Sequence, residues 1–431
     1  MTRDRWIMLV AAVILAAVLV PRATRSQGGS MRRTWLFADK VAHGVDPYTV
    51  DDPRNLHVPY PPSYGIIMAP LSVLPLAAAR ALWAVLQVIA LAGLVVLCLS
   101  WFRSMSGGTD PPLWLVAGAF ALVARYLWRD TAGGGGNLVF GALVAMACLR
   151  PGEAPGEDRH PWRGALLGIV LAAKPTPVLF LGWLWLRGRH RSFAVAIATA
   201  VALHMSPMLT LGAESWWAVE TRWIEGVWRF ATQPDLFADP ALSFPRFSWM
   251  HQSLRYCLAR YCGTVPDEFV LVNPLFFQGI GMGTAAIGGI RLLASVLLVG
   301  VTAMLLWRRR RATSAWVEIG GVAAIICLTL LLSPITWKSY HVQLFPAFFA
   351  MLALRRRSVS VGLALYFVAC VALAPWLIGR QGKEVLQSLY VVTFGALWVW
   401  VVCLRATSAP LGEQQAAVGL GEQTKVAAAP E

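Results

Sequence analysis

Stretches of mostly apolar residues, each about 20 residues long, recur along nearly the whole of the 431-residue chain. A helix of that length matches the hydrocarbon thickness of a bilayer, and it satisfies its own backbone hydrogen bonds in lipid. The chain is 57% hydrophobic and only 14% charged, so a soluble fold would need helices that are apolar on every face. The runs therefore predict an all-α polytopic membrane protein.

The net charge of +15 is concentrated between the apolar segments, in short arginine clusters at 187–191, 307–311 and 355–357. Such clusters are typical of cytoplasmic loops, so the charge does not indicate a nucleic-acid partner. No small-residue cleavage site follows the first segment, which favours a retained helix over a signal peptide. The expected apolar segments are 6–21, 81–101, 113–128, 137–149, 164–187, 191–211, 288–307, 315–334, 340–354, 358–378 and 385–404.

One segment cannot be a simple crossing if all the arginine clusters are to lie inside. A full crossing by 164–187 would place the cluster at 187–191 outside, and Pro175 and Pro177 interrupt this run near its middle. We therefore predict a hairpin of two short helices with both ends on the same side. This interpretation gives a bundle of about 11–12 transmembrane or re-entrant helices, with both termini in the cytoplasm. It forms a single domain over 1–404, and 405–431 is expected to be a disordered tail.

Two large loops, residues 22–80 and 212–287, then lie outside the membrane. In the first, "MRRTWLFADKVAHG" (31–44) predicts a short amphipathic helix closed by Gly44. The proline-rich elbow "VPYPPSYGIIMAP" (58–70) follows, in extended form, with Tyr60 at the level of the lipid headgroups. In the second loop, "SWWAVETRWIEGVWRF" (215–230) predicts an interfacial helix. Cys257 and Cys262 of the second loop could form a disulfide or remain free thiols.

Carboxylates are concentrated in the first outer loop, at Asp39, Asp46, Asp51 and Asp52. They could simply be solvated, or one of them could be a general base that accepts the proton of a sugar hydroxyl. Asp39 lies on the predicted short helix, whose fixed geometry suits a base. Asp46 precedes Pro47 and could instead brace the turn. Asp39 is therefore our first candidate for the catalytic base and Asp46 the second.

Basic and polar side chains supply candidates for substrate binding. Lys174 lies beside the proline break in the bilayer interior, where it could bind a lipid phosphate or pair with a carbonyl group. Lys338 and His341 are expected at the outer face, where His341 could donate to phosphate or cap a helix. Gln252 and Arg291 complete the set, together with Tyr60 of the elbow. There is no Walker loop, HExxH, CxxC or GxSxG motif, so we predict no cofactor and no metal.

Five stretches, in chain order, carry a family resemblance: "GVDPY", "YPPSYGIIMAPLSVLP", "AAKPTPVLFL", "HQSL" and "SPITWKSYH". Over residues 30–350 the chain resembles glycosyltransferase family 87, bacterial membrane enzymes of the GT-C class typified by polyprenol-phosphate-mannose-dependent mannosyltransferases. The resemblance implies a GT-C-like bundle in the bacterial cell (inner) membrane. It also implies transfer of a sugar, such as mannose, from a polyprenyl-phosphate donor to a lipid or glycan acceptor on the extracytoplasmic face.

The chain departs from the family pattern at two places. The acidic residue that usually opens the first outer helix falls near Ser30, where there is no carboxylate, and a Gln-Asn pair is replaced by "GGGGN" ending at Asn137. Two alternatives to an enzyme stay open: a non-catalytic lipid-glycan carrier or flippase, and a degenerate transferase that acts as a scaffold. Polar residues cluster in the outer loops instead of at mid-membrane, which favours the enzyme.

Overall fold

The computed structural model describes residues 29–49, 59–238, 247–272 and 275–408, together with isolated residues between 17 and 24. Within these residues every regular element is helical, and the only bridge of the β type joins His251 and Trp337. Five helices are long and apolar enough to cross a membrane, and two bent helix pairs bring the number to as many as seven. The prediction of an all-α polytopic membrane protein is confirmed.

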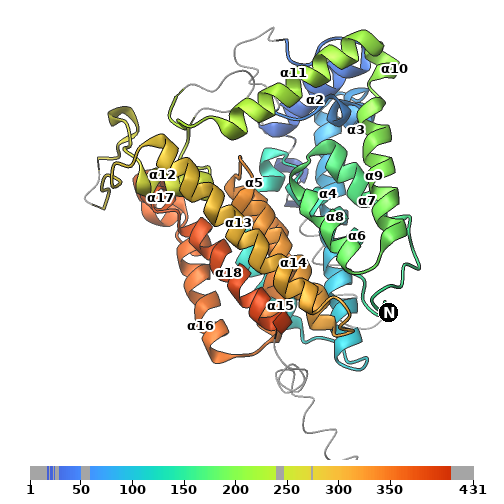
Figure 1. Cartoon of the computed structure of the whole chain (residues 1–431), viewed down its shortest axis with the longest axis vertical. Helices are drawn as coiled ribbons and strands as arrows, with labels where there is room; N and C mark the ends of the chain where they lie inside the picture. Colours follow the sequence, from blue (N-terminus) through green and yellow to red (C-terminus); the bar gives the residue numbers. More distant parts are fainter. Residues whose placement is uncertain are drawn as a thin grey trace, which may run out of the picture.

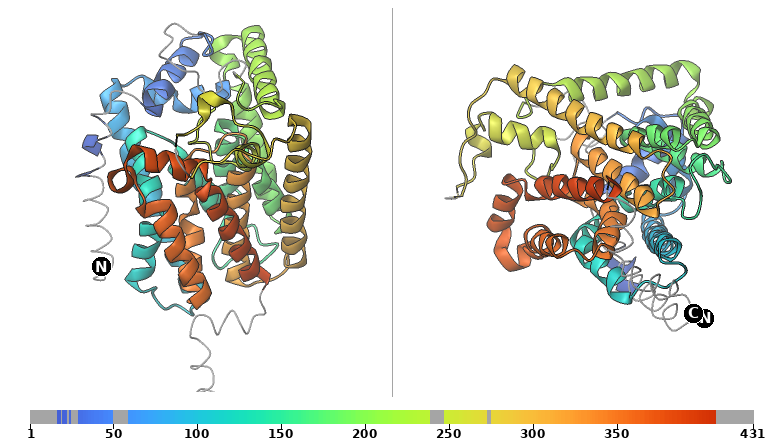
Figure 2. Two further views of the ribbon diagram at one scale, coloured as in Figure 1. Left: turned by 90° about the vertical axis from the view of Figure 1, so that its left-hand side faces the viewer. Right: turned by 60° about the horizontal axis from the view of Figure 1, so that its bottom comes forward.

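Long helices run alongside one another between the two ends of the molecule, and short helices gather at one end (Figures 1 and 2). The elements are α2 (Ser30–Ala42), α3 (Pro62–Ser72), α4 (Leu76–Met105), α5 (Leu113–Gly133), α6 (Asn137–Cys148), α7 (Arg163–Ala173), η1 (Thr176–Val178), α8 (Leu179–Leu186), α9 (His190–Met205), α10 (Met208–Leu211), α11 (Ala213–Thr232), α12 (Leu254–Cys262), η2 (Asp267–Phe269), α13 (Thr284–Arg308), α14 (Ala315–Leu332), η3 (Lys338–Leu344), α15 (Phe345–Ala353), α16 (Arg357–Tyr366), η4 (Phe367–Ala372), α17 (Pro375–Ser388) and α18 (Val391–Ser408).

Two of the arginine clusters meet at one end of the bundle, which we call the basic end. The guanidinium of Arg187 donates to the carbonyl oxygens of Arg310 and Ala312, at 3.0 Å each. Arg309 donates to the carbonyl of Ser408 at the end of α18. The clusters at 187–191 and 307–311 therefore lie on the same side, as the topology prediction requires.

The hairpin predicted for 164–187 is present in the structure. The amide of Gly156 donates to the carbonyl of Arg187 (2.8 Å), and the guanidinium of Arg163 donates to the carbonyl of Leu149 (3.0 Å). The start of α7 and the end of α8 thus both lie at the basic end. The chain turns back at Lys174, whose backbone is extended (φ −159°, ψ 100°), because the two prolines that follow cannot continue α7.

At the opposite end, which we call the loop end, the start of α2 packs onto the turn between α5 and α6. These two helices meet at 117° around Gly134. Gly134 has φ 65°, and a Cβ atom there would lie 2.4 Å from the Cβ of Met31. Only glycine adopts this positive φ without strain and has no Cβ atom to clash with Met31. The glycine run thus lets Ser30 and Met31 approach the last turn of α5.

The proline-rich elbow joins α2 to the membrane helices. Pro61 is extended (φ −66°, ψ 160°), but Pro62 is the first residue of α3, where the fixed φ of proline suits a helix start. The prediction of an elbow extended as far as residue 70 is therefore wrong. The hydroxyls of Thr34 and Tyr64 lie 3.0 Å apart and tie α2 to α3. The helix predicted for 31–44 is confirmed, and it ends before Gly44 with φ 73°.

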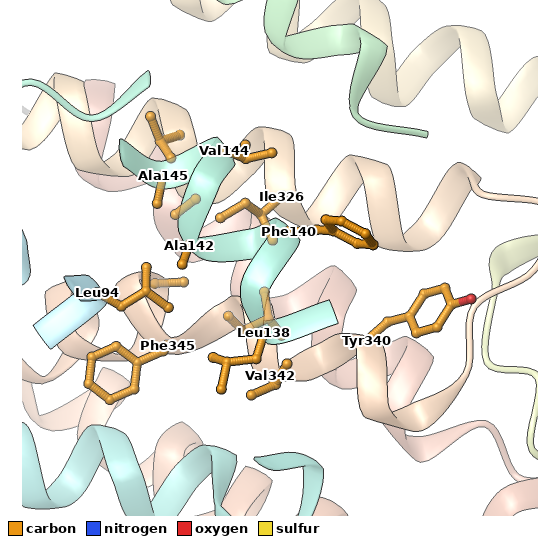
Figure 3. Packing of buried hydrophobic residues seen from close by; sticks show 14 of the residues in the cluster. Leu94, Leu138, Phe140, Ala142, Val144, Ala145, Ile326, Tyr340, Val342 and Phe345 are labelled. Carbon is orange, nitrogen blue, oxygen red and sulfur yellow. The ribbon is translucent and has the colours of Figure 1, made fainter. Parts of the chain in front are cut away.

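Helix α14 forms the centre of the bundle, with 83% of its most apolar stretch buried, whereas only 11% of the corresponding stretch of α13 is buried and α13 lies at the outside. Ile326 of α14, Leu138 of α6 and Val342 of η3 belong to one packed cluster (Figure 3). Phe345 and Tyr340 belong to the same cluster (Figure 3). Apolar packing therefore fixes η3 against α6, and this contact positions the candidate site.

Several predicted segments differ from the structure in type or length. The segment 340–354 is not one helix: the 3₁₀ segment η3 precedes the short helix α15. The segment predicted to begin at residue 385 begins as α18 at Val391, because Tyr390 has φ 52° and ends α17. Residues 405–408 continue α18, so the predicted tail began too early. The rest of that tail and most of the segment 6–21 lie outside the described residues.

Two predictions about the second outer loop can also be assessed. Helix α11 covers the amphipathic stretch predicted for 215–230, and its apolar side chains are exposed at Trp217, Ile224 and Trp228. Cys257 and Cys262 are free thiols. The loop is therefore held by packing and hydrogen bonds in the part that the structure describes.

Candidate active site

Four basic side chains form a cationic cluster toward the loop end: Arg125 and Arg129 of α5, Lys338 of η3 and Lys383 of α17. Lys338 is only 5% exposed. Burial, reinforced by the charges of the other three groups, lowers the pKa of Lys338 to about 6. No hydrogen bond or ion pair joins its Nζ to a described residue. The cluster therefore has an unused donor and an excess of positive charge.

The two arginines of this cluster are fixed by neutral partners. Arg125 donates to the carbonyl oxygens of Cys370 (3.3 Å) and Leu373 (3.0 Å), next to the π-helical turn η4. A π-helical turn leaves carbonyl groups without the usual helical partners, which explains this contact. Arg129 donates to the sulfur of Met250 (3.1 Å). Because these partners carry no charge, both guanidinium groups keep their full charge for an anion such as phosphate.

A second group, which we call the Asp130 cluster, consists of Asp130, Asn137, Lys174 and Tyr340. Asp130 is 1% exposed and accepts hydrogen bonds from Asn137 Nδ2 (2.7 Å) and the amide of Leu138 (3.0 Å). Lys174 Nζ donates to Asn137 Oδ1 (3.2 Å) and lies 3.3 Å from the ring centroid of Tyr340. Lys174 is therefore already balanced by a nearby carboxylate.

Asp130 was not among the residues predicted from the sequence. It is the one carboxylate of α5 and lies in the last turn of that helix, shortly before the four glycines of "RDTAGGGGN". A carboxylate inside an apolar span is a candidate for function by itself, so this signal was present in the sequence. Its partner Lys174 is more distant along the chain, and only the fold brings the two together.

Tyr60 of the first outer loop lies beside Tyr340 of the Asp130 cluster. The ring of Tyr60 lies 4.5 Å from that of Tyr64, and Tyr48 donates to the carbonyl of Tyr60 (2.6 Å). Burial raises the pKa of Tyr60 to about 12, so its hydroxyl is neutral and can donate a hydrogen bond. The proline-rich elbow thus places a tyrosine beside the Asp130 cluster.

His341 lies on η3 between the two clusters. Its side chain is fully buried, its Nδ1 is 3.3 Å from the carbonyl of Lys338, and its ring is 5.5 Å from that of Tyr126. Burial lowers the pKa of His341 to about 4, so the ring is neutral at pH 7. Its Nε2 has no hydrogen-bond partner among the described residues. One short segment thus connects Lys338 of the cationic cluster with Tyr340 of the Asp130 cluster.

The two predicted catalytic carboxylates lie apart from these clusters. Asp39 is half-exposed on α2, and its carboxylate is 3.3 Å from His43 Nδ1. Asp46 pairs with Arg222 (2.5 Å) and accepts a hydrogen bond from the amide of Tyr48 (2.9 Å). Asp46 therefore braces the turn, which was the alternative interpretation. A role as base stays a prediction for either residue.

Gln252 and Arg291 join segments of the loop end. Gln252 Nε2 donates to the carbonyls of Trp249 (2.9 Å) and Gln387 (3.0 Å). Arg291 donates to the carbonyl of Ala231 (3.0 Å), which ties α13 to α11. Their predicted role in substrate binding stays untested. Within the described residues no three His, Cys, Asp or Glu side chains are grouped in a way that could hold a metal ion.

Comparison with known proteins identifies relatives over most of the chain. The model of glycosyltransferase family 87 matches residues 58–334. A polyprenol-phosphate-mannose-dependent alpha-(1-2)-phosphatidylinositol mannoside mannosyltransferase of Mycolicibacterium smegmatis is 27% identical over 373 residues, which cover 80% of this chain and 74% of the relative. The protein of the same description from Mycobacterium tuberculosis is 24% identical over 360 residues (80% and 73%). No solved structure matches the chain significantly.

Proposed function

The chain belongs to glycosyltransferase family 87, and on this premise we propose that it transfers a sugar, such as mannose, from a polyprenyl-phosphate carrier to a lipid or glycan acceptor. The relatives from Mycolicibacterium smegmatis and Mycobacterium tuberculosis are named for a donor of this kind. The observation that carries the proposal is the cationic cluster, whose charge the described residues leave largely unbalanced. A lipid phosphate supplies the missing negative charge.

The reaction is proposed to take place on the extracytoplasmic face of the bacterial inner membrane. Arginine-rich short loops face the cytoplasm, so the basic end would be the inner one. Since α18 ends there, the C-terminus would be cytoplasmic as well, and the N-terminus is proposed to lie on the same side. The cationic cluster and the Asp130 cluster then lie toward the outer face.

We assign the donor phosphate to the cationic cluster and give Lys174 a different role. The side-chain nitrogen of Lys338 has no partner among the described residues, whereas Lys174 is held by Asn137 and balanced by Asp130. In the reaction, the bond between the sugar C1 and the phosphate oxygen breaks, and its electron pair stays on the phosphate. Cations fixed in advance around that oxygen stabilise the charge as it develops.

The acceptor hydroxyl must lose its proton as it attacks C1, and we rank Asp130 first among the candidate bases. Asp130 directly follows Arg129 of the cationic cluster along α5, and Asn137 connects its carboxylate to Lys174. Each of its oxygens accepts one hydrogen bond, which leaves a lone pair for the acceptor. Asp39 is half-exposed and Asp46 is engaged by Arg222, so both rank lower.

The test is transfer by the full-length protein in liposomes that contain polyprenyl-phosphate-mannose and candidate acceptor lipids, with mass spectrometry of the products. The wild type should form a mannosylated product. Asp130→Asn should lower the rate about 10²- to 10⁴-fold at unchanged donor binding, the usual contribution of a general base. Asp39→Asn serves as the matched control and should retain transfer.

Each other outcome decides against part of the proposal. Loss of transfer in Asp39→Asn with full activity in Asp130→Asn would return the role of base to Asp39. If the wild type binds polyprenyl-phosphate sugars but transfers none from a broad panel, the carrier or flippase interpretation is favoured. If it neither binds nor transfers them, the scaffold interpretation is favoured.

A further inference from the structure

A buried carboxylate outside both clusters has an oxygen without a partner. Glu220 of α11 is 7% exposed, and its Oε1 lies 3.0 Å from His204 Nδ1 of α9. No hydrogen-bond partner of its Oε2 is found among the described residues. A buried carboxylate oxygen left unpaired is costly, so such an atom in a native protein calls for a ligand or solvent partner.

The residues around Glu220 add a donor and aromatic surfaces. The indole N–H of Trp223 is also buried without a partner, and its ring lies 6.1 Å from that of His204. The indole N–H of Trp216 donates to the carbonyl of His204 (2.9 Å) and fixes the end of α9. Ser63 Oγ lies 3.5 Å from His204 Nδ1. An unused acceptor and an unused donor therefore lie beside tryptophan rings.

Other charged groups nearby do not satisfy Glu220. Arg222, two residues further along α11, pairs with Asp46 of the first outer loop. The charge of Glu220 acts on Tyr48, which is buried and donates to the carbonyl of Tyr60 instead. Among the described residues, His204 is thus the one side chain hydrogen-bonded to Glu220.

The position of α11 indicates where a ligand would come from. Trp217, Ile224 and Trp228 are 64%, 53% and 70% exposed, and at three, four and eight positions from Glu220 they form the helix face next to it. Such an apolar face is typical of a helix that lies on the membrane surface. Figure 1 shows α11 across the loop end, near the end of α9, and α9 itself is largely uncovered by protein. The Glu220 region is therefore open to lipid from its α9 side.

We propose that Glu220, His204 and Trp223 bind the polyhydroxylated headgroup of the acceptor lipid. Hydroxyls of the headgroup donate to Glu220 Oε2 and accept from Trp223 Nε1, and the tryptophan rings cover the C–H faces of the polyol. The inference rests on the proposed function, because it supplies the acceptor of that reaction. Ser63 also donates to the carbonyl of Ala172 (2.6 Å), two residues before Lys174, so this site borders the Asp130 cluster.

The test measures lipid binding by the full-length protein without donor, by native mass spectrometry of the detergent-purified protein. The probes are phosphatidylinositol, which has a polyol headgroup, and phosphatidylethanol, which has the same charge and no headgroup hydroxyl. The wild type should prefer phosphatidylinositol. Glu220→Gln should weaken phosphatidylinositol binding about 10- to 100-fold, and Trp223→Phe about 3- to 10-fold, as expected for a charged and a neutral hydrogen bond.

Control variants separate binding from folding. Glu225 lies on the same helix, exposed and paired with Arg229 (3.7 Å), so Glu225→Gln should leave binding unchanged. Phosphatidylethanol binding should be the same in all variants. If Glu220→Gln does not fold, Trp223→Phe decides the test, because it removes only the indole N–H and part of a half-buried ring.

Three results would overturn the inference: equal binding of both lipids by the wild type, unchanged phosphatidylinositol binding in both folded variants, or free myo-inositol bound as tightly as the lipid. The last result would refute the lipid headgroup as the ligand. Since no donor is present, failure of sugar transfer does not change these readouts. Conversely, transfer by a protein that binds phosphatidylinositol no better than phosphatidylethanol would overturn this site alone.

Discussion

Replacing Lys338 with arginine should remove a pH dependence of donor binding that the wild-type protein shows. Burial and the charges of Arg125, Lys383 and Arg129 lower the pKa of Lys338 to about 6. The lysine is therefore mostly neutral at pH 8, while an ammonium group is needed to bind the donor phosphate. Binding must draw a proton from solution, so the apparent dissociation constant should rise with pH.

The expected size of the effect follows from this pKa. Lys338 has a higher pKa in the complex than in the free protein. Between these two values, each pH unit weakens the free energy of donor binding by about 1.4 kcal/mol. From pH 6 to pH 8 the wild type should lose about 50-fold in donor affinity, because half of the lysines are charged at the first pH and about 1% at the second. A guanidinium stays charged over this range, so Lys338→Arg should change less than about threefold.

The assay is equilibrium binding of a polyprenyl-phosphate sugar to the protein in nanodiscs at several pH values. This donor is a phosphodiester whose own charge is constant between pH 6 and 8, so any slope arises from the protein. Lys338→Met should bind weakly at every pH. A flat wild-type profile, or an equal slope in Lys338→Arg, would refute the assignment of the phosphate to Lys338.

Three further predictions test the fold. Glu318→Gln should cost about 3–5 kcal/mol of stability, measured by unfolding in detergent, because Arg187 (3.1 Å) and Arg189 (2.6 Å) lose their shared buried carboxylate; a loss below 1 kcal/mol would contradict this reasoning. Gly164→Ala should cost about 1–3 kcal/mol, since its Cβ would lie 2.0 Å from the carbonyl of Ser192, while Gly182→Ala, with open space around it, should cost nothing. In a Cys262→Ser background, a cysteine at Arg191 should resist an impermeant thiol reagent in intact cells and one at Glu225 should react; the reverse pattern would invert the proposed orientation.

The membrane architecture followed from local signals in the sequence. Apolar runs predict helices wherever they fall, and the arginine clusters with Pro175 and Pro177 were enough to predict the hairpin that α7 and α8 form. Helices α2 and α11 were predicted from their amphipathic periodicity. The prediction of one helix over 340–354 was wrong because the apolar composition of this segment suits a membrane helix as well as it suits the observed η3 and α15.

The site was predicted only in part, because its function depends on contacts between distant segments. The sequence identified Lys174 and Lys338 as unusual charges. It could not show that Asp130 balances Lys174, while Lys338 has no carboxylate beside it among the described residues. Asp39 was the first candidate for the base because its helix could be predicted. Which face of that helix meets the bundle depends on the packing of Met31 against Gly134.

Local sequence was enough to predict most of the helices, their order along the chain and the arginine-rich end of the bundle, because hydrophobicity and charge act on each segment separately. Which polar groups are compensated depends on tertiary packing. Asn137 and Lys174 meet across 37 positions, and His204 and Glu220 meet between two helices. A charged side chain can bind a ligand only if no protein group already balances its charge. In the clusters of this site, those partners come together when α5, α6, α7 and η3 pack against one another.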